Sequence, residues 1–269
     1  MAGKDNVEMT FLEHLEELRW VIIRSLLAII IGGTLAFMLK KYVFDILILG
    51  PRDPNFISNV IICKLGKYLH TNDLCINQHP MPLQNITMGG QFNMHLWVSL
   101  VFGFILSFPY IFYQFWSFIA PALRTHERKN AHGAIFYSSV MFLAGVFFGY
   151  FVLLPFSIDF LTTYSVSDQI ENKINFVSYI SNVTMVVLAC GLVFELPIFV
   201  YFLSAIGILT PAFMLKFWRH AVIVILIVAA IIAPPDVYSQ LILAFPLIGL
   251  YFASIFISRM VVKRREKKL

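Results

Sequence analysis

Long apolar runs separated by short polar intervals dominate this chain. The runs cover about 21–39, 95–116, 133–156, 177–203, 221–233 and 241–256. An apolar run of about 20 residues is long enough to cross a bilayer as a helix. The pattern therefore predicts an all-α polytopic membrane protein with six transmembrane helices, which form one transmembrane domain over residues 1–269.

The fifth run differs from the others because it is too short to span a bilayer in the ordinary way. A helix over 221–233 reaches about 20 Å, whereas the hydrocarbon core of a bilayer is about 30 Å thick. We therefore expect a thinned bilayer or an oblique crossing in contact with the rest of the protein.

Two polar stretches have helical patterns of their own. Thr10 followed by Glu13 has the form of a capping box, and Phe11, Leu15 and Leu18 fall on one helical stripe. We expect an amphipathic helix over about 10–20 that lies on the membrane surface and continues into the first span. The long loop over about 41–93 opens with turn residues, and its apolar spacing predicts a short amphipathic helix over 60–69.

Composition supports a membrane protein and gives it an orientation. The chain is 59% hydrophobic and 13% charged, with a mean hydropathy of +0.80, outside the range of soluble domains. Its net charge of +5 does not indicate nucleic-acid binding, because the basic residues flank the apolar runs. With both termini inside, most of the twenty Lys and Arg residues are cytoplasmic, as the positive-inside rule requires. The outside loops then hold Lys40, Lys41, Arg52, Lys64, Lys67 and Lys173.

The three cysteines fall in two environments. Cys190 lies in an apolar run, whereas Cys63 and Cys75 share the loop over 41–93. If that loop is extracytoplasmic, a disulfide between Cys63 and Cys75 is allowed, and the alternative is two free thiols. The residues around them make only a weak case for a metal site.

Glu195 is the most unusual residue of the sequence, because it brings a carboxylate into the apolar run over 177–203, two residues before Pro197. An ionisable group at such depth faces a cavity or a partner in most membrane proteins, and is a structural carboxyl in others. One interpretation is a secondary transporter or channel with Glu195 in its path, but no further ionisable group lies at a similar depth to form a relay. A scaffold without a transport role is a third interpretation. Nucleotide-binding and hydrolase motifs are absent, so we expect neither an enzyme nor a cofactor.

A few carboxylates stand on the otherwise basic cytoplasmic face. They are Glu13, Glu16 and Glu17 near the N-terminus and Glu127 in the loop after the second run. Carboxylates bind a guanidinium through two parallel hydrogen bonds, which suits a ligand that carries arginine. The alternative is that each of them pairs with a neighbouring Arg or Lys on a solvated surface.

Four separated motifs give the chain a recognisable pattern. They are FLEHLEELR from Phe11, YQFWSFIAPALRTHE from Tyr113, FELP from Phe194 and PPDVYSQ from Pro234. The chain resembles the TatC family, the signal-peptide receptor and core subunit of the twin-arginine protein translocase. The resemblance covers nearly the whole chain, with the motifs in the same order.

The resemblance implies a function. It implies a glove-like protein of the cytoplasmic (inner) membrane that binds the twin-arginine signal peptides of folded precursors. It further implies an oligomeric complex with small single-span subunits of the TatA and TatB type, surrounded by membrane lipid and driven by the proton motive force.

The resemblance also assigns residues. Glu17 and Glu127 match positions that receive the two arginines, and Arg19 and Phe118 match positions that shape the same face. Glu195 matches an intramembrane carboxylate on the concave side. Partner docking falls on the region of Pro197, Asp236 and Gln240. The sequence departs from the family at Ala233, where a hydroxyl is frequent, and in its longer first loop.

Overall fold

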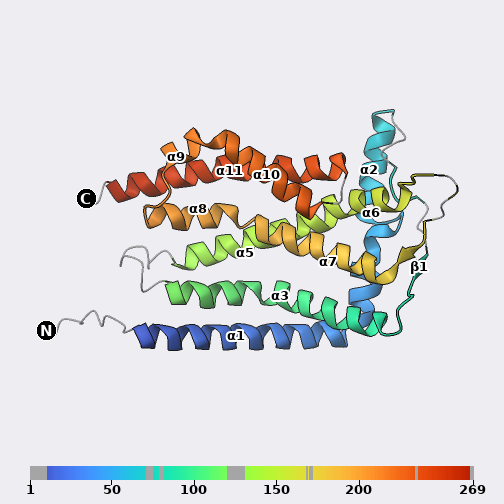
Figure 1. Ribbon diagram of the computed structural model, residues 1–269, viewed down its shortest axis with the longest axis horizontal. Coiled ribbons are helices and arrows are strands. Elements are labelled where there is room, and N and C mark those ends of the chain that lie inside the picture. Colours follow the sequence, from blue (N-terminus) through green and yellow to red (C-terminus); the bar gives the residue numbers. More distant parts are fainter. Residues whose placement is uncertain are drawn as a thin grey trace.

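The protein is a bundle of long helices that lie side by side, as seen in a computed structural model (Figure 1). The structure describes residues 11–70, 75–78, 82–119, 131–167, 169, 172–233 and 236–266. Five helical segments in this part of the chain are long and apolar enough to cross a membrane, and a sixth apolar helix is shorter. The helices of the bundle are α1 (Phe11–Met38), α3 (Gly90–Ile119), α5 (Ala131–Phe148), α6 (Leu154–Thr163), α7 (Phe176–Val193), α8 (Leu196–Ala205), α10 (Trp218–Ile232) and α11 (Val237–Glu266).

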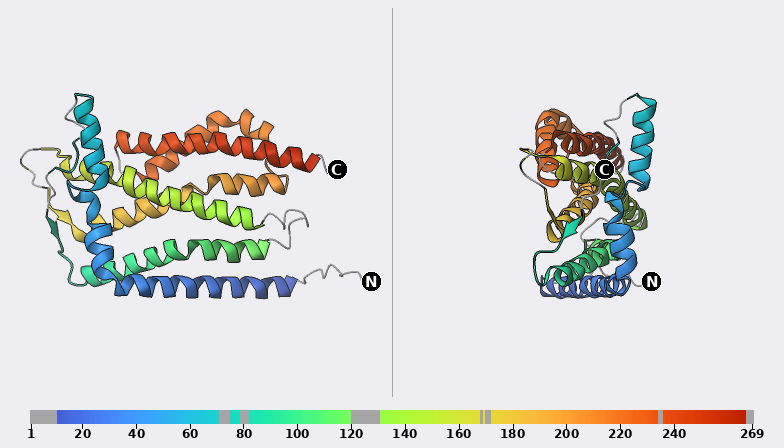
Figure 2. Two further views of the ribbon diagram at one scale, coloured as in Figure 1. Left: turned by 180° about the vertical axis from the view of Figure 1, so that it is seen from behind. Right: turned by 90° about the vertical axis from the view of Figure 1, so that its right-hand side faces the viewer.

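The bundle has two dissimilar ends, and the start of α1 and the end of α11 lie at the same one (Figures 1 and 2). We call the end where α1 begins and α11 ends the terminus end. The opposite end, the cap end, carries short elements that lie across the bundle: η1 (Tyr42–Ile48), η2 (Gly50–Arg52), α2 (Ile57–Tyr68), and the parallel pair β1 (Leu83–Gln84) and β2 (Ile174–Asn175). The remaining short helix, α9 (Pro211–Lys216), precedes α10.

The N-terminal segment is continuous with the first span. Where the sequence indicated a surface helix over 10–20, α1 is one unbroken helix from Phe11 to Met38. It packs along α3, and small residues let the two backbones approach closely: a Cβ on Gly103 would lie 2.5 Å from the backbone N of Gly33. Ser107 Oγ donates a hydrogen bond to the backbone O of Ala28 at 2.8 Å, which joins the two helices. Residues 11–20 therefore extend the axis of the first span.

The third span is longer than the predicted 133–156 because Pro155 does not end it. The five residues before Leu154 form a π-helical turn, η5 (Gly149–Leu153). Pro155 has no amide hydrogen to donate, and it lies where the hydrogen bonding changes from π-helical to α-helical. The chain remains helical to Thr163. Asp159 is therefore helical.

The helices of the fourth and sixth spans also differ from the predicted ranges. The run predicted at 177–203 is two helices, α7 and α8, separated at Phe194 and Glu195. Helix α10 has 15 residues, as short as the sequence indicated. Helix α11 has 30 residues and continues well beyond the predicted 241–256 into the charged C-terminal segment.

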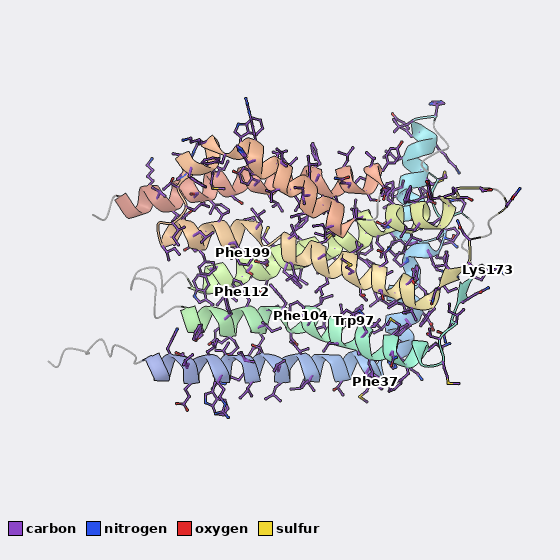
Figure 3. All side chains as sticks on the ribbon, viewed as in Figure 1. Phe37, Trp97, Phe104, Phe112, Lys173 and Phe199 are labelled. Atoms are coloured by element: carbon purple, nitrogen blue, oxygen red, sulfur yellow. A yellow bond between two sulfur atoms is a disulfide. The ribbon has the colours of Figure 1, made fainter. Side chains whose placement is uncertain are left out.

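The core lies where α3, α5 and α7 meet. Phe142 is fully buried and stacks on Phe108 with ring centroids 3.6 Å apart. Phe104 packs edge-on against the same ring (Figure 3). Trp97 Nε1 donates a hydrogen bond to Thr184 Oγ1 at 3.0 Å and so ties α3 to α7.

Buried asparagines hold the cap end together. Asn59 is fully buried, and its Nδ2 donates to the backbone O of Pro51 at 3.0 Å. Asn77 Nδ2 donates to Asn59 Oδ1 at 3.3 Å and to the backbone O of Pro155 at 3.0 Å. The backbone N of Asn77 donates to Asp159 Oδ1 at 2.7 Å. The long first loop is therefore fastened to the third span by hydrogen bonds.

A disulfide closes the same loop. Cys63 on α2 and Cys75 are bonded to each other, with a sequence separation of 12, whereas Cys190 is a buried free thiol. Of the two alternatives that the sequence left open, the structure has the bridged one.

Candidate functional site

A groove between α1 and α3 at the terminus end holds two of the predicted carboxylates, Glu16 and Glu17. Residues three, four or seven apart share one flank of a helix, which places Glu17, Trp20 and Arg24 on the side of α1 that borders the groove. On α3 the same spacing places Gln114 and Ser117 opposite them. The groove has a volume of about 340 Å³ and is lined by Glu16, Glu17, Trp20, Val21, Arg24, Gln114 and Ser117.

Glu17 is the residue that gives this groove its chemistry. Its Oε2 atom is buried and has no hydrogen-bond partner among the described residues. Gln114, across the groove, is 6% exposed. A carboxylate oxygen that is removed from water without a partner is a strong acceptor for a donor that a ligand brings.

Aromatic rings border the same region. His14 on α1 stacks on Phe118 of α3, with ring centroids 4.2 Å apart and planes 14° apart. Trp116, one residue beyond Phe115, packs on Phe202 of α8 at 4.7 Å, and its buried Nε1 has no hydrogen-bond partner among the described residues. Phe118 therefore lies at the α1–α3 contact, while Trp116 connects the pair to α8.

Three of the predicted residues are not among those that line this groove. Phe118 lies beside it, stacked on His14. Arg19 is exposed and is not among the groove-lining residues; two positions from Glu17, it points to another side of the helix because successive residues turn by about 100°. Glu127 lies outside the described residues.

Glu195 lies at the break between α7 and α8. Pro197 has no amide to donate, so the ladder is interrupted here, and the backbone O of Glu195 accepts from the amides of Ile198 and Phe199 instead. The Glu195 side chain is 4% exposed, and its Oε2 accepts a hydrogen bond from Ser138 Oγ of α5 at 2.8 Å. The carboxyl is therefore held between three helical segments.

Glu195 lies deeper in the bundle than the groove. Phe202, seven residues beyond Glu195, is in contact with Trp116, which lies beside the groove-lining Ser117. Seven residues of helix rise about 10 Å. Glu195 is thus about 10 Å further toward the cap end than the groove around Glu17.

The turn between α10 and α11 holds the remaining predicted residues. Asp236 Oδ2 accepts from the amide of Ser239 at 2.6 Å, so Asp236 caps the start of α11. Gln240 Nε2 donates to the backbone O of Leu226 at 3.2 Å and ties the two helices together. Asp236 Oδ1 and Ser239 Oγ are buried without hydrogen-bond partners among the described residues.

Sequence reasoning missed most of the residues that complete these sites. Trp20, Gln114 and Ser117 line the groove, and Ser138 binds Glu195. A signal was present for two of them: Gln114 and Ser117 are polar residues three positions apart near the end of an apolar run, which places them on one face. Nothing in the sequence pairs Ser138 with Glu195, because they come from different spans.

These features define a polytopic α-helical membrane protein with a carboxylate in a groove at one end and a second carboxylate at a helix break. Comparison with known proteins gives its family. The profile described as Sec-independent protein translocase protein (TatC) matches residues 13–246.

The same name belongs to two full-length relatives. The TatC protein of Blattabacterium sp. subsp. Periplaneta americana is 41% identical over 260 residues, which cover 96% of this chain and 98% of that protein. The TatC protein of Aquifex aeolicus is 34% identical, with the same coverage of 96% and 98%.

Solved structures agree with this result. A crystal structure described as the twin arginine translocase receptor TatC in DDM superposes with a TM-score of 0.71 at 33% identity, covering 91% of this chain and 99% of that one. A second crystal structure of the receptor gives a TM-score of 0.67, covering 93% and 100%.

The chain therefore belongs to the TatC family. It is a subunit of the Sec-independent protein translocase, a transport component and not an enzyme. The family and the all-α membrane fold predicted from the sequence are confirmed, and the secondary-transporter interpretation is set aside.

Proposed function

We propose that this subunit is the receptor for twin-arginine signal peptides and that the groove between α1 and α3 receives the arginine pair. The observation that carries the proposal is the buried Oε2 of Glu17, which has no hydrogen-bond partner among the described residues and lies in an open groove. The two solved relatives bear the description of a twin arginine translocase receptor, which supports the same role.

The chemistry of arginine suits this groove. A guanidinium presents its N–H donors in a rigid fork that matches a carboxylate, whereas a lysine ammonium is a point charge. Glu17 offers the carboxylate, Gln114 offers an amide opposite it, and Phe118 and His14 offer stacked rings nearby. We assign Glu127 to the second arginine on the strength of its motif.

The sites away from the groove are assigned to assembly with partner subunits, after the signal peptide has bound. We place small single-span partner subunits against the region of Glu195, Pro197, Asp236 and Gln240. The two carboxylates and Ser239 there include buried oxygens that have no hydrogen-bond partner in the part of the chain that the structure describes. In this proposal the terminus end faces the cytoplasm, the cap end faces outward from the inner membrane, and assembly with the partners couples export to the proton motive force.

The proposal is tested with labelled signal peptides carrying either Arg-Arg or Lys-Lys, titrated into the purified protein in detergent micelles. Glu17→Gln should weaken binding of the Arg-Arg peptide about tenfold, because a charge-assisted hydrogen bond of roughly 1.5 to 3 kcal/mol is lost. The Lys-Lys peptide should lose less.

Glu16→Gln is the matched control, since Glu16 lines the same groove and carries the same charge on an exposed side chain. If both variants weaken both peptides equally, the effect is nonspecific charge and Glu17 is not the arginine receptor.

A further inference from the structure

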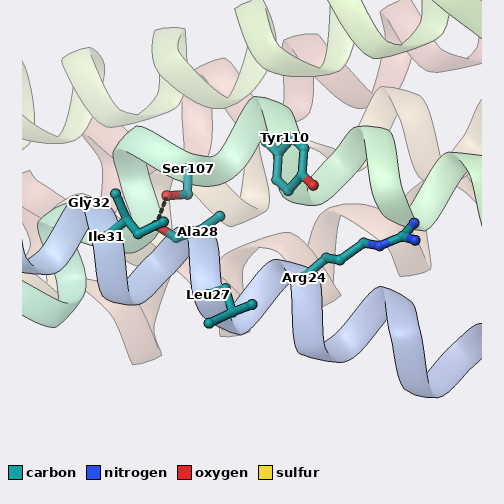
Figure 4. Close-up of a pocket in the computed structure, with 7 residues that line it drawn as sticks. All are labelled: Arg24, Leu27, Ala28, Ile31, Gly32, Ser107 and Tyr110. Carbon is teal, nitrogen blue, oxygen red and sulfur yellow. Dashed lines mark hydrogen bonds between the residues drawn. The ribbon is translucent and has the colours of Figure 1, made fainter.

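A second groove continues along α1 and α3 beyond the first, toward the middle of the bundle. It has a volume of about 420 Å³ and shares Arg24 with the groove around Glu17. Figure 4 shows its lining, which consists of Arg24, Leu27, Ala28, Ile31, Gly32, Ser107 and Tyr110.

The polar groups of this groove gather at one end. Arg24 stretches along the groove toward the N-terminal end of α1, and Tyr110 faces it from α3 (Figure 4). Ser107 Oγ, by contrast, already donates its hydrogen bond to the backbone O of Ala28, at 2.8 Å. The donors available to a ligand are therefore those of Arg24 and Tyr110.

Arg24 keeps most of its hydrogen-bonding capacity. Its guanidinium lies over the ring of Trp20, 6.0 Å from the centroid. A contact of this kind uses none of the five N–H donors of a guanidinium, and among the described residues Arg24 makes no hydrogen bond or ion pair. The side chain itself is exposed.

The rest of the groove is apolar and open to the side. Leu27 is 52% exposed and Ile31 is 70% exposed. Gly32 contributes no side chain, and α1 and α3 are so close there that a Cβ would lie 3.1 Å from the backbone O of Gly103. The floor is therefore formed by backbone, with apolar side chains along the rim.

The depth of Arg24 places its charge near a headgroup layer. Arg24 lies 14 residues before Met38, the last residue of α1, which corresponds to about 21 Å of helix. A hydrocarbon core is about 30 Å thick, so the Arg24 Cα lies inside the core and does not reach the headgroup layer at the terminus end. Its long side chain points back along the helix and closes much of that gap.

We propose that this groove binds one anionic phospholipid, with the phosphate on Arg24 and Tyr110 and an acyl chain along Leu27 and Ile31. The charge, the depth and the apolar wall each match one part of such a lipid. From Arg24 to Ile31 the groove runs about 10 Å along the helix, which seats the upper part of the chain.

The adjoining groove marks where this lipid site ends. Glu17 lies two helical turns from Arg24 on the same flank of α1, and a phosphate beside its carboxylate would be repelled. One continuous surface between α1 and α3 is thereby divided into a part for cations around Glu17 and a part for an anionic lipid beyond Arg24.

The test is native mass spectrometry of the purified protein in detergent micelles, titrated with phosphatidylglycerol or with phosphatidylcholine of the same acyl chains. The wild-type protein should retain phosphatidylglycerol preferentially. Arg24→Gln should weaken that binding about tenfold, as expected for the loss of a charge-assisted contact. The affinities of Arg24→Lys and Tyr110→Phe for phosphatidylglycerol should lie between those of the wild-type protein and Arg24→Gln.

Arg219→Gln is the matched control, because Arg219 is also exposed and also lies over a neighbouring ring, that of Trp218, at 5.7 Å. It should leave phosphatidylglycerol binding unchanged. Competing inorganic phosphate should not displace the lipid, since it lacks the acyl chain.

Equal retention of the two lipids by the wild-type protein would overturn the proposal. So would equal loss in the Arg24 and Arg219 variants, or full displacement by inorganic phosphate. Crosslinks between two copies of the chain from position 31 that persist at saturating phosphatidylglycerol would assign the groove to a subunit contact instead.

Discussion

The asparagine network of the cap end and the groove region of the terminus end treat their buried polar groups in opposite ways. At the cap end, Asn59 and Asn77 are bonded to backbone carbonyls, to each other and to Asp159, and a disulfide closes the loop. At the terminus end, Glu17 Oε2 and Trp116 Nε1 are buried without partners among the described residues. The asparagine network satisfies its donors and acceptors internally, whereas the groove region at the terminus end leaves some for a ligand.

The difference separates parts that hold the fold from parts that bind. A buried polar atom without a partner costs roughly 1 to 3 kcal/mol, so its retention needs a reason outside the folded chain. The turn between α10 and α11 shows the same property in Asp236 Oδ1 and Ser239 Oγ. It is also the region to which we assign partner docking.

The largest effect is expected for Asn59→Ala at the cap end. Asn59 Nδ2 also donates to the backbone O of Asp53 at 2.8 Å, so the variant leaves two carbonyls and the Asn77 amide short of a partner. The unfolding free energy in detergent micelles should fall by about 3 kcal/mol. Asn85→Ala, which removes an exposed hydrogen bond to Thr87, should change it by less than about 0.5 kcal/mol. Equal losses of unfolding free energy in the two variants would mean that the buried hydrogen bonds of Asn59 stabilise the cap end no more than an exposed one does.

Cys63→Ser should destabilise the cap end by about 2 kcal/mol, because a bridge between residues 12 apart no longer restricts the unfolded loop. Limited proteolysis should show faster cleavage around α2. Cys75→Ser and the double variant should match the single one. Alkylation without reductant, followed by mass spectrometry, should leave both cysteines of the wild-type protein unlabelled, and labelling of both would contradict the disulfide.

Ser138→Ala tests the carboxylate that lies between the two ends. Glu195 Oε2 loses its hydrogen bond from a fully buried serine, and the unfolding free energy should fall by about 1 kcal/mol. Ser139→Ala is the control, since that hydroxyl bonds only within its own helix, to the backbone O of Ile135. If the two variants behave alike, Glu195 does not depend on Ser138.

Glu17→Gln should have the smallest effect on stability. Its buried Oε2 has no partner to lose within the described ranges, and a neutral amide is less costly to bury than a carboxylate. We expect the unfolding free energy to change by less than about 0.5 kcal/mol, or to rise, while peptide binding falls. A clear loss of stability would mean that Glu17 holds the fold and would break the contrast with the cap end.

Much of the fold could be predicted from the pattern along the chain. The apolar runs located the helices, the short fifth run predicted the length of α10, and Pro197 marked the break at Glu195. These features are local, because a run or a proline acts on the few residues around it. The length of the third span was wrong because η5 accommodates Pro155.

The site was only partly predictable, since it depends on how spans pack. Glu17 and Phe118 were found through motifs, but the position of Gln114 opposite Glu17 requires the register between α1 and α3, which glycine contacts such as Gly33 with Gly103 set. The bond between Ser138 and Glu195 joins residues 57 positions apart. The periodicity of one segment does not show which residue of a distant segment it will contact.

The connections of the cap end imply an order in which the protein is assembled. The Cys63–Cys75 ring is short and can close once its own loop has emerged. The bond from Asn77 to Asp159 spans 82 residues and must wait for α3, α5 and α6. The pairing of Leu83 with Ile174 must wait longer still, until the chain reaches the start of α7. The cap end thus closes in stages during synthesis, and β1 pairs with β2 only after three spans have been threaded into the bilayer.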